Sequence, residues 1–221
     1  METTPRDSGS PTDRIPYIEI PGDGDLVAFG GQLTPSRLEN AYTTGIFPWY
    51  EDNSPVLWWS PDPRAILEFE DLEVSRRLAR TVRSGRFEVT RDRDFAGVIR
   101  GCAEARSGET WITQEMIDAY VRFHRLGRAH SVEVWRQGRL VGGIYGVSIG
   151  GFFAGESMFY RERDASKVGL VFLVEHLKER GYSFLDLQIL NEHTEAFGGI
   201  EIPRVDYLDR LEEATRMDVD F

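Results

Sequence analysis

The spacing of apolar residues divides the chain into a first part that predicts mainly helices and a second part that predicts mainly strands. Four helices are expected before residue 127, because apolar positions recur at helical spacing after residues that cap helices. These helices run from Thr34 to Gly45, from Ser75 to near Gly85, from Asp94 to Ala105 and from Thr113 to about Leu126. Short strands are expected at residues 64–70 and 87–90.

From Ser131 onward the pattern predicts a run of strands joined by tight turns. Gln137-Gly138 and Gly150-Gly151 separate three apolar stretches, so we expect a three-stranded antiparallel meander. A helix from Asp164 to Arg180-Gly181, a strand from Ser183 to Leu190 and a helix from Pro203 to Thr215 follow. The order predicts an α+β fold with a mostly antiparallel central sheet. We expect a disordered tail at residues 1–14, a small α/β domain at 15–65 and a larger domain at 66–221.

The loop at residues 45–61 carries three of the five tryptophans and three prolines. Prolines at this density exclude one continuous helix or a central strand. Aromatic rings on a proline-stiffened loop form a surface on which a nucleobase can stack. The alternative is a small aromatic core around a turn, and composition alone leaves both open.

Composition places the chain among soluble globular proteins and excludes several classes of function. With 41% hydrophobic and 29% charged residues, and no apolar run near the roughly 20 residues that cross a bilayer, we expect no membrane contact. The N-terminus lacks a secretory signal and Cys102 is the only cysteine, so we expect a cytoplasmic protein without disulfides. The four histidines lack the spacing of a metal site.

Charge is distributed unevenly along the chain. A net charge of −11 argues against nonspecific coating of nucleic acid. Residues 76–93 nevertheless hold seven arginines against two acids, and the helical spacing puts Arg76, Arg80 and Arg83 on one face. This segment is a candidate site for anions such as phosphates.

Two pairs of residues on predicted strands are candidates for chemistry. Strand alternation puts Glu156 and Met158 on one face, where a carboxylate beside apolar walls could hold a cationic group. Asp186 and Gln188 also share a strand face, and an acid with an amide could orient a nucleophilic amine and stabilise developing charge. The alternatives are a solvent-facing glutamate and a buried structural pair.

Several strings in the chain, many of them rich in aromatic residues or glycine, form a pattern that extends along its length. In the first half they are Phe29-Gly-Gly-Gln-Leu-Thr-Pro, Ala41-Tyr-Thr-Thr-Gly-Ile-Phe-Pro-Trp-Tyr, Trp58-Trp-Ser-Pro-Asp-Pro-Arg and Thr110-Trp-Ile-Thr. In the second half they are His130-Ser-Val-Glu-Val-Trp, Leu140-Val-Gly-Gly-Ile-Tyr-Gly-Val, Gly155-Glu-Ser-Met-Phe, Ala165-Ser-Lys, Asp186-Leu-Gln and Glu201-Ile-Pro-Arg. Together these strings resemble the signatures of the leucyl/phenylalanyl-tRNA–protein transferases, and the resemblance covers nearly the whole chain from about residue 17.

The resemblance implies a fold, a reaction and partners. The fold is a small N-terminal domain followed by a domain like the GNAT acyltransferases. The reaction moves leucine or phenylalanine, with methionine as a further candidate, from charged tRNA to the α-amine of a protein that begins with Arg or Lys, which marks that protein for degradation. Because the ester of aminoacyl-tRNA is already activated, no metal or other cofactor is expected. We also expect a monomer.

The resemblance also implies roles for particular positions. Trp49 and Trp111 would hold the terminal adenosine of the tRNA, whereas Trp58 and Trp59 would pack the small domain against the large one. Walls of the pocket for the amino-acid side chain would be Ile144, Phe153, Met158 and Leu170, with Ser157 beside them. Glu156 would face a cationic group, Asp186 and Gln188 would be the catalytic pair, and Arg76, Arg80 and Arg83 would contact acceptor-stem phosphates.

Some positions depart from the pattern of these transferases and leave alternatives open. Tyr160 and the string Ala196-Phe-Gly-Gly differ from the usual residues, which leaves a preference for acidic acceptor N-termini open. An acyl-CoA-dependent N-acetyltransferase would need a glycine-rich loop for pyrophosphate, which is not found between residues 155 and 167. The third alternative is a tRNA-binding module without catalysis.

Overall fold

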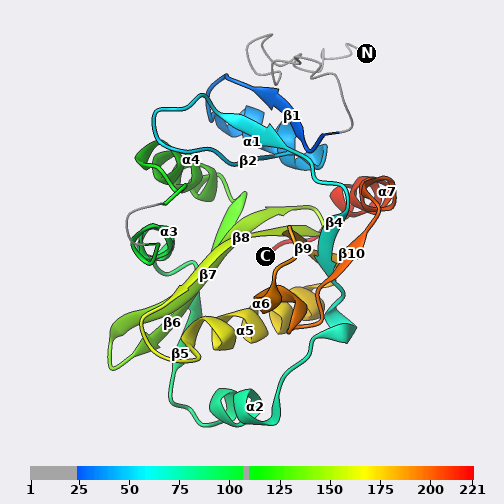
Figure 1. Ribbon diagram of the computed structural model, residues 1–221. Coiled ribbons are helices and arrows are strands. Elements are labelled where there is room, and N and C mark those ends of the chain that lie inside the picture. Colours follow the sequence, from blue (N-terminus) through cyan, green and yellow to red (C-terminus); the bar gives the residue numbers. More distant parts are fainter. Residues whose placement is uncertain (1–23, 107–109) are drawn as a thin grey trace, which may run out of the picture.

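The computed structural model describes residues 24–106 and 110–221 (Figure 1). The tail predicted at residues 1–14 lies outside these ranges. The described chain contains a three-stranded sheet, in the order β1-β3-β2, and a seven-stranded sheet, in the order β10-β4-β9-β8-β7-β6-β5. Helix α1 lies beside the small sheet, and the other helices surround the large one (Figure 1).

Two strands of the small sheet come from the tryptophan-rich loop at residues 45–61. Its strands are β1 (Leu26–Phe29), β2 (Phe47–Pro48) and β3 (Leu57–Trp59), and they pair antiparallel. Helix α1 (Pro35–Thr43) begins as predicted, because the Thr34 side chain accepts a hydrogen bond from the Arg37 amide. Trp58 is completely buried, and its Nε1 donates to the Gly30 carbonyl at 2.9 Å. The loop is therefore partly an aromatic core.

The large sheet confirms the predicted α+β class with a mostly antiparallel sheet. Its strands are β4 (Arg64–Leu67), β5 (Glu88–Arg91), β6 (Ala129–Arg136), β7 (Arg139–Ile149), β8 (Phe152–Tyr160), β9 (Phe184–Gln188) and β10 (Ile200–Ile202). Every neighbouring pair is antiparallel except β8 and β9, which run parallel. Strand β4 begins just before the predicted domain boundary at residues 65–66, and that boundary stays a prediction.

Helices cover both faces of the large sheet. They are α2 (Arg76–Arg83), α3 (Phe95–Glu104), α4 (Gln114–Arg125), α5 (Ala165–Arg180), α6 (Glu192–Glu195) and α7 (Arg204–Thr215), with a 3₁₀ turn η2 at Phe69–Asp71. The caps predicted at Ser75 and Thr113 each accept an amide hydrogen bond three residues on, and so does Asp94, where a helix was predicted to begin. The short elements α6 and β10 were not predicted from the sequence.

The two larger apolar clusters of the described residues hold these layers together. On one face of the sheet, side chains from α3, α4 and the small domain form a continuous core that includes Trp58, Tyr120 and Phe159. On the other face, α5 contributes Leu170, Leu173 and further side chains to a second core. The small domain thus shares its core with the first face of the large sheet, and residues at their junction are fixed by packing from both sides.

Candidate active site

The candidate site lies where strands β8 and β9 stop pairing. Their parallel ladder joins Phe152–Ala154 to Phe184–Asp186 and extends no further. Beyond it, Glu156 on β8 and Gln188 on β9 are linked by side chains instead, since Gln188 Nε2 donates to Glu156 Oε1 at 2.8 Å. Two polar side chains of the predicted set therefore meet at the point where the sheet opens.

Gln188 adopts an unusual backbone conformation that Asp186 stabilises. Its φ of +64° lies in the left-handed region, which few residues other than glycine occupy. The Gln188 amide donates to Asp186 Oδ1 at 2.8 Å, so the aspartate side chain satisfies the turned backbone. The side chain of Asp186 therefore holds the backbone at the end of strand β9 in this conformation.

Asp186 is enclosed by protein groups. Arg64 Nε and Nη2 donate to its two oxygens at 2.9 and 2.7 Å, and Tyr207 Oη donates to Oδ2 at 3.0 Å. The side chain of Asp186 is 0% exposed and that of Arg64 is 1% exposed. Burial alone would lower the pKa of Arg64, but the Asp186 carboxylate raises it above its ordinary value. A direct role of Asp186 on substrate stays a prediction, and the contacts observed are those of a positioning residue.

Arg64 was not assigned a role from the sequence. Besides Asp186 it contacts the small domain, because Nη1 donates to the Gly45 carbonyl at 3.0 Å. Its guanidinium lies 5.0 Å from the centroid of the Phe47 ring and 4.5 Å from that of Tyr207. The sequence does contain a feature that points to Arg64, since it begins an otherwise apolar strand. A buried arginine needs a partner of opposite charge.

The prediction that Glu156 and Met158 share a face is wrong. Gly146 pairs with Gly155 whereas the next residue back, Tyr145, pairs with Ser157, so Glu156 is the extra residue of a β-bulge. The bulge turns Glu156 toward the small domain and α4. Met158 lies on the opposite face, packed in the core beneath α5.

Glu156 is buried among hydrogen-bond donors. Tyr42 Oη donates to Oε1 at 2.7 Å and Tyr120 Oη donates to Oε2 at 3.3 Å, in addition to the bond from Gln188. Burial raises the pKa of Glu156 to about 7, although the bond from Tyr42 opposes the shift. Glu156 therefore changes charge near neutral pH. Neither tyrosine was picked out from the sequence, since both contacts span distant segments.

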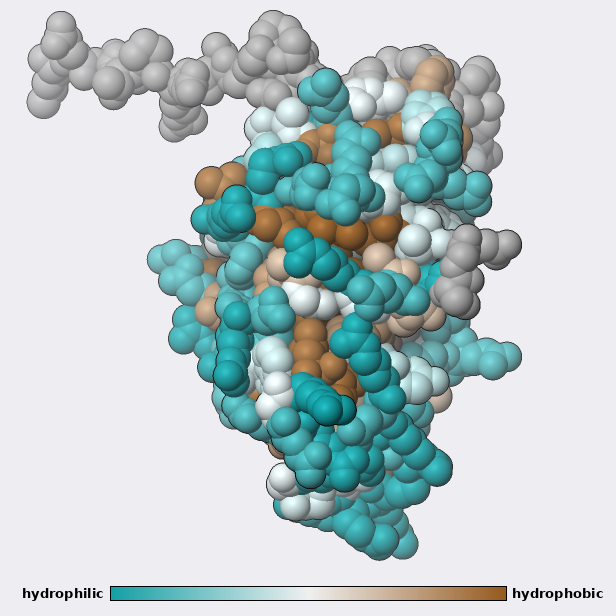
Figure 2. Space-filling model, turned by 90° about the vertical axis from the view of Figure 1, so that its left-hand side faces the viewer, coloured by the Kyte–Doolittle hydropathy of each residue, from teal (hydrophilic) through white to brown (hydrophobic). Residues whose placement is uncertain are grey.

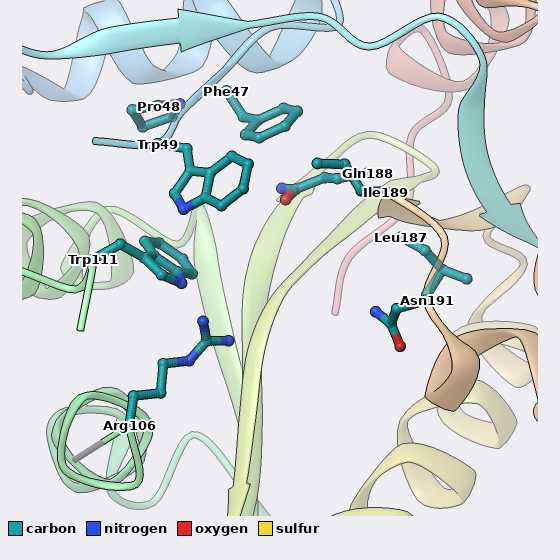
Figure 3. Close-up of a pocket in the computed structure, with 9 residues that line it drawn as sticks. All are labelled: Phe47, Pro48, Trp49, Arg106, Trp111, Leu187, Gln188, Ile189 and Asn191. Carbon is teal, nitrogen blue, oxygen red and sulfur yellow. The ribbon is translucent and has the colours of Figure 1, made fainter. Parts of the chain in front are cut away.

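A cavity of about 240 Å³ opens beside Gln188 (Figure 3). Its lining residues are Phe47, Pro48, Trp49, Arg106, Trp111, Leu187, Gln188, Ile189 and Asn191. Trp49 is 41% exposed although it is one of the largest apolar side chains of the chain. Trp111 lies below Trp49 in the view, and the side-chain amide of Gln188 points toward both rings (Figure 3). The structure thus brings Trp49, Trp111 and Gln188 together, as a common site requires.

The four residues predicted as pocket walls lie together on the α5 face. Ile144, Phe153 and Leu170 are buried there, and Met158 packs against the same core. The Phe221 ring stacks on Phe153 with centroids 5.5 Å apart. None of the four lines the cavity, but Leu187 belongs both to the cavity wall and to this core. Ser157 is nearly buried on the other face, and its Oγ accepts from Arg106 Nη2 at 3.4 Å.

The basic helix α2 lies at the bottom of the view, below the large sheet (Figure 1), and contributes no residue to the cavity lining. Arg77 anchors it by donating to both oxygens of Asp164 at 2.6 and 3.0 Å. Arg76, Arg80 and Arg83 are exposed.

On the side of the molecule that carries α3 and α4, apolar side chains reach the surface in a band across the upper half, and hydrophilic ones cover the lower end (Figure 2).

Within residues 24–106 and 110–221, no three side chains of the His, Cys, Asp and Glu type are grouped so that they could hold a metal ion. In the same ranges, every helix is too short or too polar to cross a bilayer.

Comparison with known proteins decides the family. The model of the leucyl/phenylalanyl-tRNA protein transferase family matches residues 66–212, and the model of that family's N-terminal domain matches residues 31–62. The chain belongs to this family. A curated transferase from Anaeromyxobacter sp. is 56% identical over 90% of this chain and 86% of its own length. The one from Stutzerimonas stutzeri is 54% identical over 84% of this chain and 83% of its own. Membership makes the chain an aminoacyltransferase.

Solved structures resemble this transferase at a lower level. A GCN5-related N-acetyltransferase from Kribbella flavida covers 71% of this chain and 56% of its own, with 11% identity and a TM-score of 0.40. L-PGS from Bacillus licheniformis covers 66% of this chain and 49% of its own, with 13% identity and a TM-score of 0.41. Similarity at this level carries no argument about how the chain works.

Proposed function

We propose that this transferase moves leucine or phenylalanine from charged tRNA to the α-amine of proteins that begin with Arg or Lys, and that the reaction takes place beside Gln188. The observation that supports this assignment best is the fixed Gln188 amide at a cavity with two tryptophans. An activated ester needs little chemical help from the enzyme. It needs the amine and the ester carbonyl to be held together in the right orientation.

The two tryptophans suit the terminal adenosine of the tRNA. Trp49 is exposed at the cavity, and its backbone is fixed because Trp59 Nε1 donates to the Trp49 carbonyl at 2.7 Å. Stacking of a base on an aromatic side chain contributes about 1–3 kcal/mol. Adenosine between Trp49 and Trp111 would bring its 3′ ester toward Gln188, which lines the same cavity.

Gln188 orients the attacking amine. An ionised carboxylate has only acceptors, so the Gln188 side chain must turn its NH₂ group toward Glu156 and leave its carbonyl oxygen for another donor. That oxygen accepts a hydrogen bond from the acceptor amine and points the nitrogen lone pair at the ester carbonyl. Asp186 holds the Gln188 backbone, and Arg64 holds Asp186.

The atoms balance without a cofactor. The amine nitrogen forms a bond to the carbonyl carbon, and the bond from that carbon to the ribose oxygen breaks. The nitrogen loses one proton and the ribose oxygen gains one, so the reaction needs no net acid or base. Glu156, whose pKa is about 7, faces the positive charge of the acceptor from behind Gln188.

The side chain that is transferred enters the core beneath α5. Ile144, Phe153, Met158 and Leu170 give it apolar walls, and Leu187 connects that core to the cavity. A β-branched side chain would misplace a methyl group, which typically costs about 1–3 kcal/mol. The exposed arginines of α2 hold the acceptor-stem phosphates farther along the tRNA.

The test is a transfer assay with defined donors and acceptors. The purified protein is incubated with radiolabelled Leu-tRNA and with peptides that differ only in a first residue of Arg, Lys, Asp, Glu or Val. We expect transfer to the Arg and Lys peptides. Transfer to the Asp and Glu peptides alone would overturn the acceptor assignment, and transfer to none would overturn the function. Acetyl-CoA replaces Leu-tRNA in a parallel reaction, where acetylation would favour an N-acetyltransferase.

A pair of variants links the activity to the cavity. Gln188→Ala removes the amide that faces the amine, so we expect kcat to fall at least a hundredfold. Gln114→Ala is the matched control, because Gln114 is an exposed glutamine on α4 that bonds only Asp118 among the described residues. Equal rates for the two variants would remove Gln188 from the reaction.

A further inference from the structure

The cavity beside Gln188 contains one charged side chain. Of the nine residues that line it, eight are apolar or neutral and the ninth is Arg106. Arg106 lies two residues beyond the end of helix α3 and is exposed. Within residues 24–106 and 110–221, no carboxylate lies within ion-pair distance of its guanidinium. A positive charge at the wall of a mostly apolar cavity favours an anionic group on the ligand.

Neighbouring side chains hold the guanidinium in place. Its Cζ lies 5.2 Å from the centroid of the Trp111 ring, and its Nη2 donates to Ser157 Oγ at 3.4 Å. Stacking on an aromatic ring leaves the edges of the guanidinium free to donate further hydrogen bonds. Arg106 is thus oriented toward the cavity before any ligand binds, as Figure 3 shows.

Arg106 and Gln188 lie on opposite sides of the cavity (Figure 3). Trp111 stands beside Arg106, whereas Asn191 and Leu187 stand on the side of Gln188. A nucleotide that spans the cavity with its 3′ ester at Gln188 has the 5′ oxygen of its ribose at the other end of the sugar. The charged group on that oxygen in a nucleic acid is a phosphodiester.

We propose that Arg106 binds the phosphodiester that joins the last two nucleotides of the donor tRNA. This inference rests on the proposed function, because it takes the terminal adenosine to lie in the cavity. A guanidinium donates two parallel hydrogen bonds to a phosphate, and a contact of this kind fixes the position of a nucleotide along a protein surface. Arg106 therefore sets how far the ribose enters the cavity, and with it the distance from the ester to Gln188.

The experiment compares two small donors that differ in one charge. Leucyl-adenosine lacks the phosphate, whereas leucyl-adenosine 5′-methyl phosphate carries it with the single charge of a phosphodiester. For the unaltered protein we expect KM for the phosphate donor to be about tenfold or more below KM for leucyl-adenosine, as the strength of charged hydrogen bonds suggests. Arg106→Gln should bring the two values within twofold of one another, chiefly by raising KM for the phosphate donor.

Matched variants separate this role from a structural one. Arg100→Gln removes an exposed arginine from helix α3 itself and should leave the preference intact. Arg106→Lys keeps the charge but loses the paired donors, so it should retain only part of the preference. If Arg106→Gln weakened the use of both donors equally, Arg106 would only support Trp111, and the proposal would be wrong.

Binding without turnover provides a second measurement. Adenosine and adenosine 5′-methyl phosphate are titrated against tryptophan fluorescence, which Trp49 and Trp111 should report. We expect the phosphate to strengthen binding to the unaltered protein and not to Arg106→Gln. Equal binding of both compounds to the unaltered protein would overturn the role proposed for Arg106. It would not contradict the proposed transfer from Leu-tRNA, which the transfer assay tests separately. Loss of all transfer by the unaltered protein would instead mean that the proposed function is wrong.

Discussion

Arg64 and Asp186 form a buried, bidentate ion pair at the contact between the small domain and the large sheet. The pair has N–O distances of 2.9 and 2.7 Å. Gly45 of the small domain, Tyr207 of α7 and the Gln188 amide complete its hydrogen bonds. A buried ion pair whose partners are all satisfied holds the surrounding elements in one arrangement, and here that arrangement includes the residue proposed to orient the amine.

The first prediction concerns the stability of this pair. Asp186→Ala leaves Arg64 charged and buried without the carboxylate that neutralises it, so the free energy of unfolding should fall by about 3–5 kcal/mol. Urea denaturation followed by circular dichroism measures this loss. Glu88→Ala is the control, because the exposed Arg93–Glu88 pair should contribute less than about 1 kcal/mol. A variant Asp186→Ala as stable as the unaltered protein would contradict the prediction.

A double variant separates stability from catalysis. Arg64→Met with Asp186→Leu replaces the ion pair by apolar side chains and should recover much of the lost stability. Leucine at position 186 has no oxygen to accept the hydrogen bond from the backbone N–H of Gln188, so we expect transfer to remain low. Recovery of both would mean that Asp186 acts only through folding.

The second prediction concerns pH. The pKa of Glu156 is about 7 in the folded protein against 4.5 for an ordinary glutamate. Below pH 4.5 the group is protonated in both states, and as the pH rises to 7 it ionises first in the unfolded chain. Stability is therefore lost over this range, by on the order of 3 kcal/mol. Glu156→Gln should remove this part of the pH dependence, as urea titrations at pH 5 and pH 8 would show.

The control for this prediction is Glu175→Gln, which changes an exposed glutamate on helix α5. It should reproduce the pH dependence of the unaltered protein. If Glu156→Gln lost as much stability between pH 5 and pH 8 as Glu175→Gln does, the glutamate would ionise normally in the folded protein.

Local features of the sequence predicted most of the fold, whereas contacts between distant segments decided the site. The caps at Thr34 and Thr113 depend on residues three positions away, so the helices that follow them were predicted near their observed bounds. The bulge at Glu156 depends on how β8 pairs with β7, and simple alternation gave the wrong face. The partner of Asp186 is Arg64, which lies 122 positions away.

The third prediction concerns the exposed tryptophan of the cavity. Trp49→Ala should raise KM for Leu-tRNA about 5- to 150-fold through loss of stacking, and Trp49→Phe should restore part of the affinity. Because Trp49 is 41% exposed, the melting temperature should change little. Trp135→Ala is the control, since Trp135 is partly buried on β6 and bonds Thr90. A KM effect no larger than that of the control would remove Trp49 from the donor site.

The fourth prediction concerns helix α2, which the cavity does not touch. If Arg80 and Arg83 neutralise two phosphates, changing both to Gln should reduce the slope of log affinity for tRNA against log salt by about 1.4–1.8, with the lower value for single-stranded contacts. Binding is measured by fluorescence anisotropy between 50 and 200 mM salt, roughly the range over which such contacts are weakened. Arg216→Gln, which changes an exposed arginine at the end of helix α7, should leave the slope unchanged. Leucyl-adenosine has no acceptor stem, so its transfer should be equal for the double variant and the unaltered protein. A double variant that impaired both donors alike would show that these arginines support the fold instead of the tRNA.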